Sequence, residues 1–361
     1  MIMTVNERHF LGFIRYALFG GEYPRGILTR AGWKEQQKMA KDQTVTGLFY
    51  TAVSQLPPEL RPPQQMLMKL YSNVVYMENM NKMLNRCTCD IFEIYKSLGA
   101  HPILLKGQEV ATLYEHPELR AFGDIDIFVP DWNKAIDKWI LANAERVDSL
   151  AGKEHLSAFN WKGAVVENHL CLLKFYNRDL ACKMDDIVNS ELPEKRTECF
   201  VTIDGHQLEV LPRTLELLYQ IVHFSKHLIL SGVGLRQLCD ITLTMHHYYK
   251  DIDSEKLCKW FDMLEIRKMA NAVAAAAVRY LGLPSEEVPY DYKQDAFGEK
   301  EDDLMEIVMD AANFGYWLKM GKKKSWYERL SRNIRQYARI YPYMPKEART
   351  EIGLVLLGKL K

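Results

Sequence analysis

The chain has 361 residues, of which 48% are hydrophobic, and this is enough to bury the cores of two or three domains. Its 47 basic residues balance 47 acidic ones, which excludes a global field that attracts nucleic acid or an anionic membrane, so such a partner would need a local patch. The seven cysteines are scattered without a CxxC pair, which argues against a disulfide framework and excludes a zinc ribbon.

The sequence shows neither a membrane span nor a secretory leader. No stretch approaches the ~18 consecutive apolar residues of a spanning helix. Charged residues interrupt the N-terminal stretch, which lacks a basic leader before a clean apolar core. We therefore expect a cytoplasmic protein whose cysteines stay reduced.

Residues 1–97 predict a helical N-terminal region. Apolar residues recur at helical spacing in residues 29–53 and 63–99, and two proline pairs between these segments predict a connecting loop. Gly99 is placed to end the second of these helical segments.

Residues 98–211 predict an α/β core on a small sheet, because short apolar strands alternate with helical segments there. The expected strands are residues 101–107, 124–130 and 163–173, and the expected helices are residues 108–116 and 131–144. Asp131 is the candidate N-cap of the second helix. A hairpin is predicted around Asp204 and Gly205, which suit a two-residue turn.

Residues 212–361 predict a helical C-terminal region with an acidic, proline-containing loop at 284–303. Its segment from Lys319 to Arg339 carries eight basic residues against one acidic residue, with apolar residues beside them at helical spacing. Two interpretations stay open: the solvated basic face of an amphipathic helix, and a patch that binds RNA or another anionic surface.

Asp124 and Asp126 interrupt the apolar strand at 124–130. Residues i and i+2 of a strand project from the same face, so the two carboxylates stand side by side while Ile125 and Ile127 point into the core. Such carboxylates repel one another unless a cation lies between them, and Mg²⁺ takes oxygen ligands of this kind. The alternative interpretation is a strand end that faces water.

The residues around this pair favour the metal site. Gly123 allows a backbone or a ligand to approach closely. Lys106 and Gly107, at the end of the preceding strand, offer a cation and an open backbone turn for a phosphate. Arg120 lies four residues before Asp124 and offers a second cation.

The order LKG, helix, arginine and GDIDIFV resembles the nucleotidyltransferase superfamily, whose members include DNA polymerase β and aminoglycoside nucleotidyltransferases. More narrowly, it is similar to a poorly characterised bacterial nucleotidyltransferase-like family with an LKG…R…GDIDLLV core. The resemblance implies an α/β (α+β) core with a small mixed sheet, flanked by helical N- and C-terminal regions. It also implies that Asp124 and Asp126 hold Mg²⁺ or Mn²⁺.

The resemblance further implies a third carboxylate from a neighbouring strand. Glu167 stands in "GAVVENHL", which resembles the family's ExH strand, and His169 lies two residues on, on the same face. Glu167 is therefore the expected third ligand, and His169 is an expected nucleotide contact. Four other carboxylates stay open as the third ligand: Asp185, Asp186, Asp204 and Glu209.

One feature departs from the superfamily pattern. Its members usually open the helix after the first strand with a Gly-Ser pair that holds the triphosphate, whereas this chain has Lys106, Gly107 and Gln108 there. The narrower family shares this LKG form. Lys106 is expected to replace the contact of the missing hydroxyl with a charge.

The segment from His223 to Asp240 contains four further candidates. His223 and His227 are four residues apart, a spacing that suits either a zinc site or a packed pair. Arg236 and Asp240 have the spacing of an ordinary helical ion pair. All four also match a recurring "H…H…LR…D" feature of the narrower family, which implies that they face the cleft.

These observations predict an enzyme that transfers a nucleoside monophosphate from an NTP to an acceptor hydroxyl with a divalent metal ion. The acceptor, which is a small molecule, a saccharide or a macromolecule, is not specified by the sequence. Two alternatives stay open. One is an inactive nucleotidyltransferase-like protein that binds a nucleotide or a partner, and the other is an RNA-acting enzyme that uses Lys319–Arg339.

Overall fold

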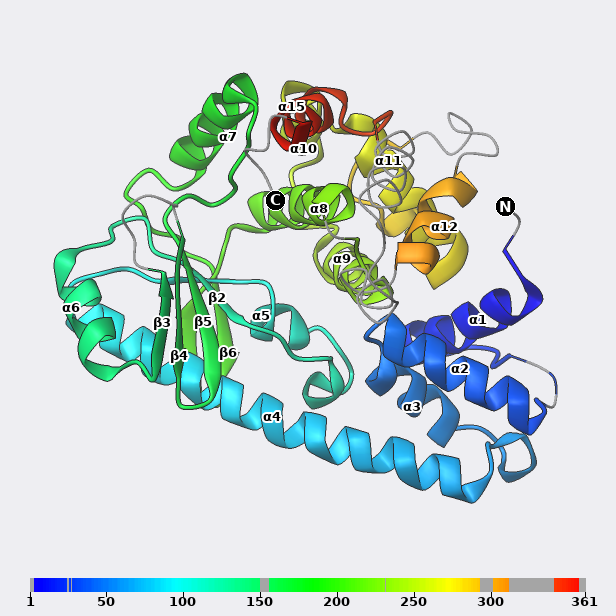
Figure 1. Cartoon of the computed structure of the whole chain (residues 1–361). Helices are drawn as coiled ribbons and strands as arrows, with labels where there is room; N and C mark the ends of the chain where they lie inside the picture. The colour runs from blue at the N-terminus through cyan, green and yellow to red at the C-terminus, as the bar shows by residue number, and fades with distance from the viewer. Residues whose placement is uncertain are drawn as a thin grey trace.

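The computed structural model describes residues 3–24, 26, 28–149, 156–230, 232–292, 301–311 and 341–356. Figure 1 shows a small β-sheet at one side of the molecule, a larger group of helices at the other, and one long helix running beneath both. The fold is therefore mixed α/β with a small sheet and helical regions, as the sequence predicts.

Helices form the N-terminal part of the chain, as predicted. They are α1 (Val5–Phe19), α2 (Arg30–Asp42), α3 (Thr46–Ser54), the short 3-10 helix η1 (Pro58–Leu60) and α4 (Gln64–Ser97). Thr4 caps α1, because its side chain accepts a hydrogen bond from the Glu7 N–H while the Glu7 carboxylate accepts one from the Thr4 N–H. α4 ends just before Gly99, which has the positive φ of 79° that suits a helix stop.

The main sheet has five strands in the order β1-β2-β5-β4-β3. They are β1 (Ile103–Leu105), β2 (Ile125–Phe128), β3 (Arg146–Ser149), β4 (Leu156–Trp161) and β5 (Ala164–His169). β2 and β5 pair in parallel, and the other neighbours are antiparallel, so the sheet is mixed.

Strands β3 and β4 were not predicted from the sequence. β3 is polar and alternates between exposed and half-buried residues, so it lacks the apolar run that identified the other strands. β4 joins β5 through Lys162 and Gly163, whose φ values of 50° and 79° fit a tight two-residue hairpin turn. The predicted strand at 163–173 therefore begins one residue too early and ends beyond His169.

The predicted hairpin is confirmed as β6 (Phe200–Ile203) and β7 (His206–Glu209), with Asp204 and Gly205 at positive φ in the turn. It forms a separate two-stranded sheet. A single parallel bridge between Leu104 and Val210 links the end of the hairpin to β1.

The helices of the α/β part differ from the prediction in three respects. They are α5 (Gln108–Ala111), the 3-10 helix η2 (Pro117–Leu119), α6 (Lys134–Asn143) and α7 (Arg178–Glu191), of which α7 was not predicted. α5 is a single turn that ends at Ala111, whereas the prediction continued it to His116. The predicted N-cap of α6 is wrong: Asn133 accepts hydrogen bonds from the first turn, and Asp131 accepts one from the His101 N–H instead.

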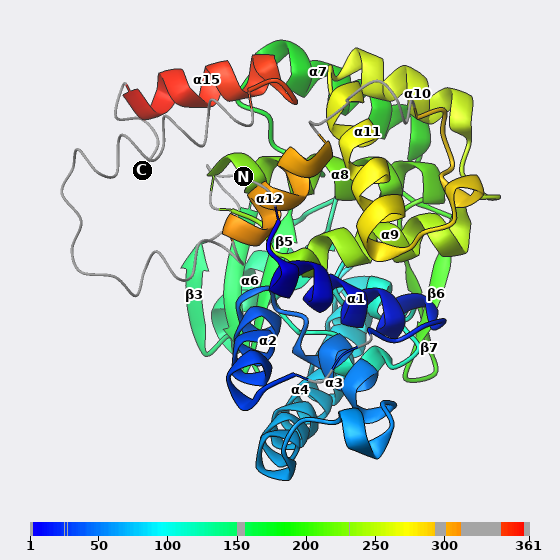
Figure 2. The ribbon, with the colours of Figure 1, turned by 90° about the vertical axis from the view of Figure 1, so that its right-hand side faces the viewer.

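The C-terminal part is helical, as predicted. Its elements are α8 (Arg213–Leu230), α9 (Leu235–Tyr248), α10 (Ser254–Met263), α11 (Arg267–Ala276), the π-helical turn η3 (Ala277–Leu281), the 3-10 helix η4 (Ser285–Glu287), α12 (Glu301–Ala311) and α15 (Pro345–Leu356). The basic segment Lys319–Arg339 lies outside the described residues. Figure 2 shows α1, α2 and α3 gathered beneath these helices, and α1 packs against η3.

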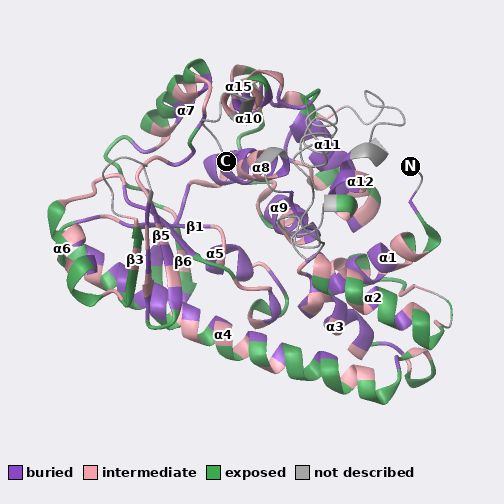
Figure 3. Ribbon diagram, viewed as in Figure 1, coloured by how far each residue is buried: buried purple, intermediate pink, exposed green. Residues whose placement is uncertain are grey.

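The two faces of β2 contact different layers. Ile125 and Ile127 pack into a core with α4 and α6, and burying an isoleucine of this kind contributes about 1.5–3 kcal/mol. The opposite face, which carries Asp126, turns toward α8. Figure 3 shows that the central strands, α8 and α9 are largely buried, while the outer side of α4 is exposed. β2 is therefore anchored by its isoleucines and presents its aspartates to the helices.

Among the helices in the described part of the chain, none has the length and apolar character to cross a membrane.

Candidate functional site

The parallel pairing of β2 with β5 gathers two carboxylates and one imidazole. Asp126 lies opposite Glu167 in the register of the two strands, and Phe128 lies opposite His169. The donor atoms of Asp126, Glu167 and His169 all lie within 4.8 Å of one another. Elsewhere in the described residues, no other group of three such donors forms.

The candidates for the third carboxylate lie in different parts of the structure. Glu167 lies in the cluster with Asp126. Asp204 lies in the turn of the β6–β7 hairpin, and Asp185 lines a separate cavity beside α7. Neither Asp186 nor Glu209 belongs to the cluster. The geometry thus brings together Asp126 and Glu167, whose ligand roles remain predictions.

Asp124 has a different environment from Asp126. It lies immediately before β2 and is exposed, whereas Asp126 is 5% exposed. Its carboxylate is not part of the 4.8 Å cluster but lines the same cavity. A Cβ atom at Gly123 would meet Arg236 Nη1 at 3.8 Å, an ordinary contact, so packing does not require glycine before Asp124.

The carboxylates line a cavity of about 390 Å³, here called the main cavity. The sheet forms one wall, and α8 and α9 form the wall opposite. These helices contribute Tyr219, Gln220, His223, His227, Arg236, Gln237 and Asp240. The four residues that the sequence predicted to face the cleft are all among them.

Lys106 lies at the turn between β1 and α5 and reaches the cluster. Lys106 and Gly107 have positive φ values of 35° and 59°, a conformation that costs a lysine free energy. The Lys106 Nζ atom lies 3.3 Å from Asp126 Oδ2 and 2.9 Å from His223 Nε2. The turn therefore directs its cation at the strand aspartate.

His223 and His227 form a pair on one face of α8. Their Nε2 atoms lie 3.0 Å apart, and Lys106 donates to the His223 Nε2. Burial and the nearby Lys106 lower the pKa of both rings, that of His227 to about 4, so both are neutral at pH 7. The pair belongs to no three-donor metal group in the described residues, so the geometry favours the hydrogen-bonded pair over a zinc site.

Arg120 is paired within the protein. Its Nε and Nη2 atoms donate to the two carboxylate oxygens of Asp240 at 2.8 and 2.7 Å, and Tyr114 donates its hydroxyl to the same carboxylate at 2.7 Å. Arg120 is 7% exposed and so is Asp240. The predicted ion pair between Arg236 and Asp240 is therefore wrong, because Asp240 is already bound bidentately by Arg120.

Arg236 has no carboxylate partner among the described residues. Its Nη1 atom donates to the backbone carbonyls of Ala121 and Phe122, at 2.9 and 3.3 Å. Burial and repulsion from Arg120 lower its pKa. Arg236 is thus a cation in the wall of the main cavity whose charge is not balanced by an ion pair.

The pKa values of the carboxyl groups in the cavity are shifted in opposite directions. Partial desolvation of the carboxyl group raises the pKa of Asp124, although the residue as a whole is exposed, and burial raises that of Glu167; repulsion from Asp126 adds to the effect in both. Burial also acts to raise the pKa of Asp126, but Lys106 and His169 outweigh it, so the net shift is downward. Asp126 is therefore a stable anion, while at Asp124 and Glu167 the attraction of Lys106 does not outweigh desolvation and the repulsion from Asp126.

The donor set fits a divalent cation. The side-chain carboxylates of Asp124 and Glu167 have no hydrogen bond or ion pair within the described residues, so the negative charge that lines the cavity exceeds what Lys106 supplies. Three buried polar atoms of the same cavity also lack a hydrogen-bond partner: Tyr219 OH, Gln220 Oε1 and Arg236 Nε. Buried polar groups are normally satisfied, so these three atoms are free to bond a polar ligand in the cavity.

Sequence reasoning missed Tyr219, Gln220 and Gln237 as cavity residues. One available signal was the spacing of Tyr219, His223 and His227, which recur every four residues and so share a face of α8. The Tyr219 and His223 rings lie 5.6 Å apart.

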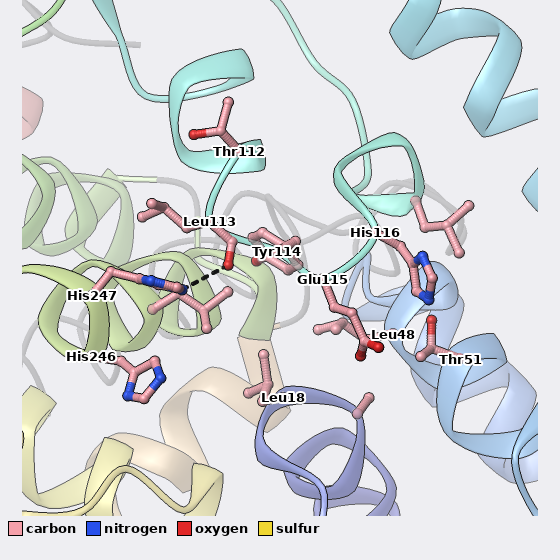
Figure 4. Close-up of a pocket in the computed structure, with 13 residues that line it drawn as sticks. Leu18, Leu48, Thr51, Thr112, Leu113, Tyr114, Glu115, His116, His246 and His247 are labelled. Atoms are coloured by element: carbon pink, nitrogen blue, oxygen red, sulfur yellow. Dashed lines mark hydrogen bonds between the residues drawn. The ribbon is translucent and has the colours of Figure 1, made fainter. Parts of the chain in front are cut away.

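A second cavity, of about 310 Å³, lies between α1, α3, the segment from Thr112 to Leu119 and the end of α9. Figure 4 shows its polar side chains, with the hydrogen bond that His247 donates to the Leu113 carbonyl drawn as a dashed line. Tyr114 lines this cavity, while its hydroxyl reaches Asp240 in the wall of the main cavity. The buried side chain of Tyr114 therefore connects the second cavity with the wall of the main cavity.

Comparison with known families gives a match over residues 29–282 to the family described as "Uncharacterised nucleotidyltransferase". This range contains every residue that lines the main cavity. None of the curated proteins matches the chain. Among solved structures, the chain is similar to an antigenic nucleotidyltransferase-like protein from Paracoccidioides brasiliensis, with 14% identity and a TM-score of 0.34 over 57% of this chain and 96% of that one.

Proposed function

The chain belongs to the family of uncharacterised nucleotidyltransferases, and from this premise we propose that it is a divalent-metal-dependent enzyme that transfers a nucleoside monophosphate from an NTP to an acceptor hydroxyl. The observation that carries the proposal is the unbalanced carboxylate group in the main cavity. Asp124, Asp126 and Glu167 line this cavity, and Lys106 is the only lysine or arginine in ion-pair contact with any of them among the described residues.

Asp124, Asp126 and Glu167 would hold the metal ion. When bound, a divalent ion neutralises phosphate charge and orients the α-phosphorus for attack. Asp126 is suited to permanent ligation because it remains ionised across the physiological pH range. Asp124, exposed at the start of β2, is accessible to an ion that arrives with the nucleotide.

Glu167 is the candidate proton acceptor. It is half-buried, its pKa is raised by burial and by Asp126, and its carboxylate accepts no hydrogen bond within the described residues. A raised pKa brings a carboxylate closer to the range in which it accepts a proton efficiently near neutral pH. Glu167 would take the hydroxyl proton as the acceptor oxygen bonds to the α-phosphorus and pyrophosphate leaves.

Arg236 and Lys106 are the candidate phosphate cations. Arg236 lines the cavity without a carboxylate partner, whereas both forks of Arg120 are held by Asp240. We therefore assign to Arg236 the phosphate contact that the sequence suggested for Arg120. Lys106, with the open backbone of Gly107 beside it, supplies charge where related enzymes have a serine hydroxyl, and the imidazole of His169 borders the same space.

A second candidate function is nucleotide binding without turnover. One observation favours it: Lys106 lies 3.3 Å from Asp126 and so puts an internal cation where a metal ion would be needed. The alternative of an RNA-acting enzyme depends on Lys319–Arg339, which the described residues do not include.

The test is to incubate the protein with each of the four NTPs, labelled at the α-phosphate, together with cell extract and Mg²⁺ or Mn²⁺. We expect label to pass to an acceptor with the wild-type chain and not with Asp126→Asn. Metal-dependent NTP binding without any transfer of label would instead support the second candidate.

A further inference from the structure

The metal-binding cluster contains a nitrogen donor as well as oxygen donors. Of the two aspartates at β2, only Asp126 lies in the cluster, and its companions there are Glu167 and His169. The set within 4.8 Å is therefore two carboxylates and one imidazole, whereas the aspartate pair alone would have offered oxygen atoms only.

The backbone fixes where the imidazole of His169 stands. His169 ends β5, pairs with Leu156 of β4 and lies opposite Phe128 of β2. Its carbonyl accepts a hydrogen bond from the Val129 N–H at 2.9 Å. Because neighbouring strands hold His169 from both sides, its position does not depend on a flexible loop. Its side chain projects from the same face as that of Glu167, which lies two residues before it on the strand.

The two oxygens of Asp126 have different partners. Oδ2 lies 3.3 Å from Lys106 Nζ, and Oδ1 lies 3.0 Å from His169 Nε2. The Glu167 carboxylate lies beside them without a hydrogen bond or an ion pair in the described residues. Asp126, Glu167 and His169 would therefore hold an ion together, since their donor atoms all lie within 4.8 Å of one another.

We propose that His169 is a direct nitrogen ligand of the metal ion, and that the site consequently selects a first-row transition ion such as Mn²⁺ over Mg²⁺. This inference rests on the metal site of the proposed function and adds the identity of its ion. Mg²⁺ takes oxygen ligands almost exclusively, whereas transition ions bind imidazole nitrogen well. In the structure the Nε2 atom of His169 donates its hydrogen to Asp126 Oδ1, so an ion held by Nε2 would take the place of that hydrogen and the ring would carry its hydrogen on Nδ1 instead.

The test is pulsed electron paramagnetic resonance of the Mn²⁺-loaded full-length chain, which detects a ¹⁴N nucleus bonded to manganese. We expect nitrogen modulation in the wild type, its loss in His169→Gln, and its retention in His227→Gln. His227 is the matched control, because its imidazole lines the same cavity but lies outside the three-donor cluster.

Calorimetric titration adds a second readout. We expect Mn²⁺ to bind the wild type at least ~10-fold more tightly than Mg²⁺, and His169→Gln to reduce this ratio severalfold, because an amide oxygen replaces the nitrogen. Bound Mn²⁺ without nitrogen modulation, or modulation that persists in His169→Gln, would overturn the inference while leaving the proposed function intact. Failure of any divalent ion to bind, with or without an NTP, would overturn both.

Discussion

The main cavity has two charged walls that differ in how their charges are paired. On the α9 side, Arg120 and Asp240 are joined by two hydrogen bonds, and Tyr114 donates a third. On the sheet side, the carboxylates of Asp124 and Glu167 have no hydrogen bond or ion pair among the described residues, and Asp126 shares Lys106 with His223. Buried charge alone therefore does not identify a functional group: the paired wall is explained by its internal ion pair, whereas the unpaired wall is the one to which we assign a ligand.

Arg120→Met is expected to have the largest effect, and it acts on stability. It leaves the buried Asp240 carboxylate without its cation, which typically costs about 3–5 kcal/mol of unfolding free energy. Denaturant unfolding measures the loss. The matched control is Lys38→Met, which breaks the exposed ion pair with Asp42 and should cost less than about 1 kcal/mol. Similar losses of unfolding free energy in the two variants would show that the buried Arg120–Asp240 pair matters no more to stability than an exposed ion pair.

Asp126→Asn is expected to act on function. Loss of a central charged group at a phosphoryl-transfer site should lower the rate of label transfer by about 10²–10³-fold, equivalent to about 2.7–4 kcal/mol. The control is Asp90→Asn, an exposed aspartate paired with Lys162 and remote from the cavity lining. If Asp126→Asn transferred label at the wild-type rate, the sheet wall would not be catalytic.

A third group of charges joins Lys226 of α8 to two carboxylates of α15. It lies between the paired and the unpaired wall in character, because a single cation is paired with two carboxylates. Lys226 lies 3.1 Å from Glu347 and 3.8 Å from Glu351, and both carboxylates are fully buried. Burial and repulsion from Glu347 outweigh Lys226 and raise the pKa of Glu351 from 4.5 to about 7.

The folded chain therefore binds the Glu351 proton more tightly than the unfolded chain does. The contribution of this group to the free energy of unfolding is greatest below pH 4.5 and falls as the pH rises to about 7. Glu351→Gln should remove this loss and stabilise the protein at pH 8 by on the order of 1–3 kcal/mol. Unfolding measured from pH 5 to pH 8 tests it, with the exposed Glu255→Gln as control. An unchanged pH profile in Glu351→Gln would show that this carboxyl is not responsible.

Gly47→Ala is expected to change stability by about as much as Glu351→Gln, and it tests how the chain before Arg120 is supported. A Cβ atom at Gly47 would lie 1.9 Å from the Leu119 carbonyl oxygen, in the residue before Arg120. Overpacking of this kind costs about 1–3 kcal/mol. Gly353→Ala, on α15 with nothing within 4 Å of the added Cβ, should instead be neutral or slightly stabilising. Equal stability of the two variants would contradict the close approach.

The elements that follow simple rules were predicted from the sequence. β2 was identified because its isoleucines alternate with aspartates, and the β6–β7 turn because Asp204 and Gly205 suit positive φ. β3 was missed because its residues lack an apolar run. β4 alternates buried and half-buried residues, and the Lys162–Gly163 turn was a further signal for the hairpin, so β4 could have been predicted. The cap of α6 was misplaced because Asp131 and Asn133 are both good caps and the choice depends on His101.

The site was partly predictable for a similar reason. The spacing of Asp124, Asp126, Glu167 and His169 follows from strand geometry, so their common face could be expected. The pairing of Arg120 with Asp240 joins residues 120 positions apart, and no local rule selects that partner over Arg236. Tertiary packing determines such pairs, and it also determines which residues line the second cavity.

Equilibrium binding of each NTP, with and without Mg²⁺ or Mn²⁺, tests the central claim that the unpaired sheet wall holds a metal ion for the nucleotide. The comparison is between the wild type and the double variant Asp124→Asn plus Asp126→Asn, with folding of the variant verified by its unfolding curve. We predict metal-dependent binding of at least one NTP to the wild type and its loss in the double variant. Binding that needs no metal ion, or that is unchanged in the double variant, would contradict the account.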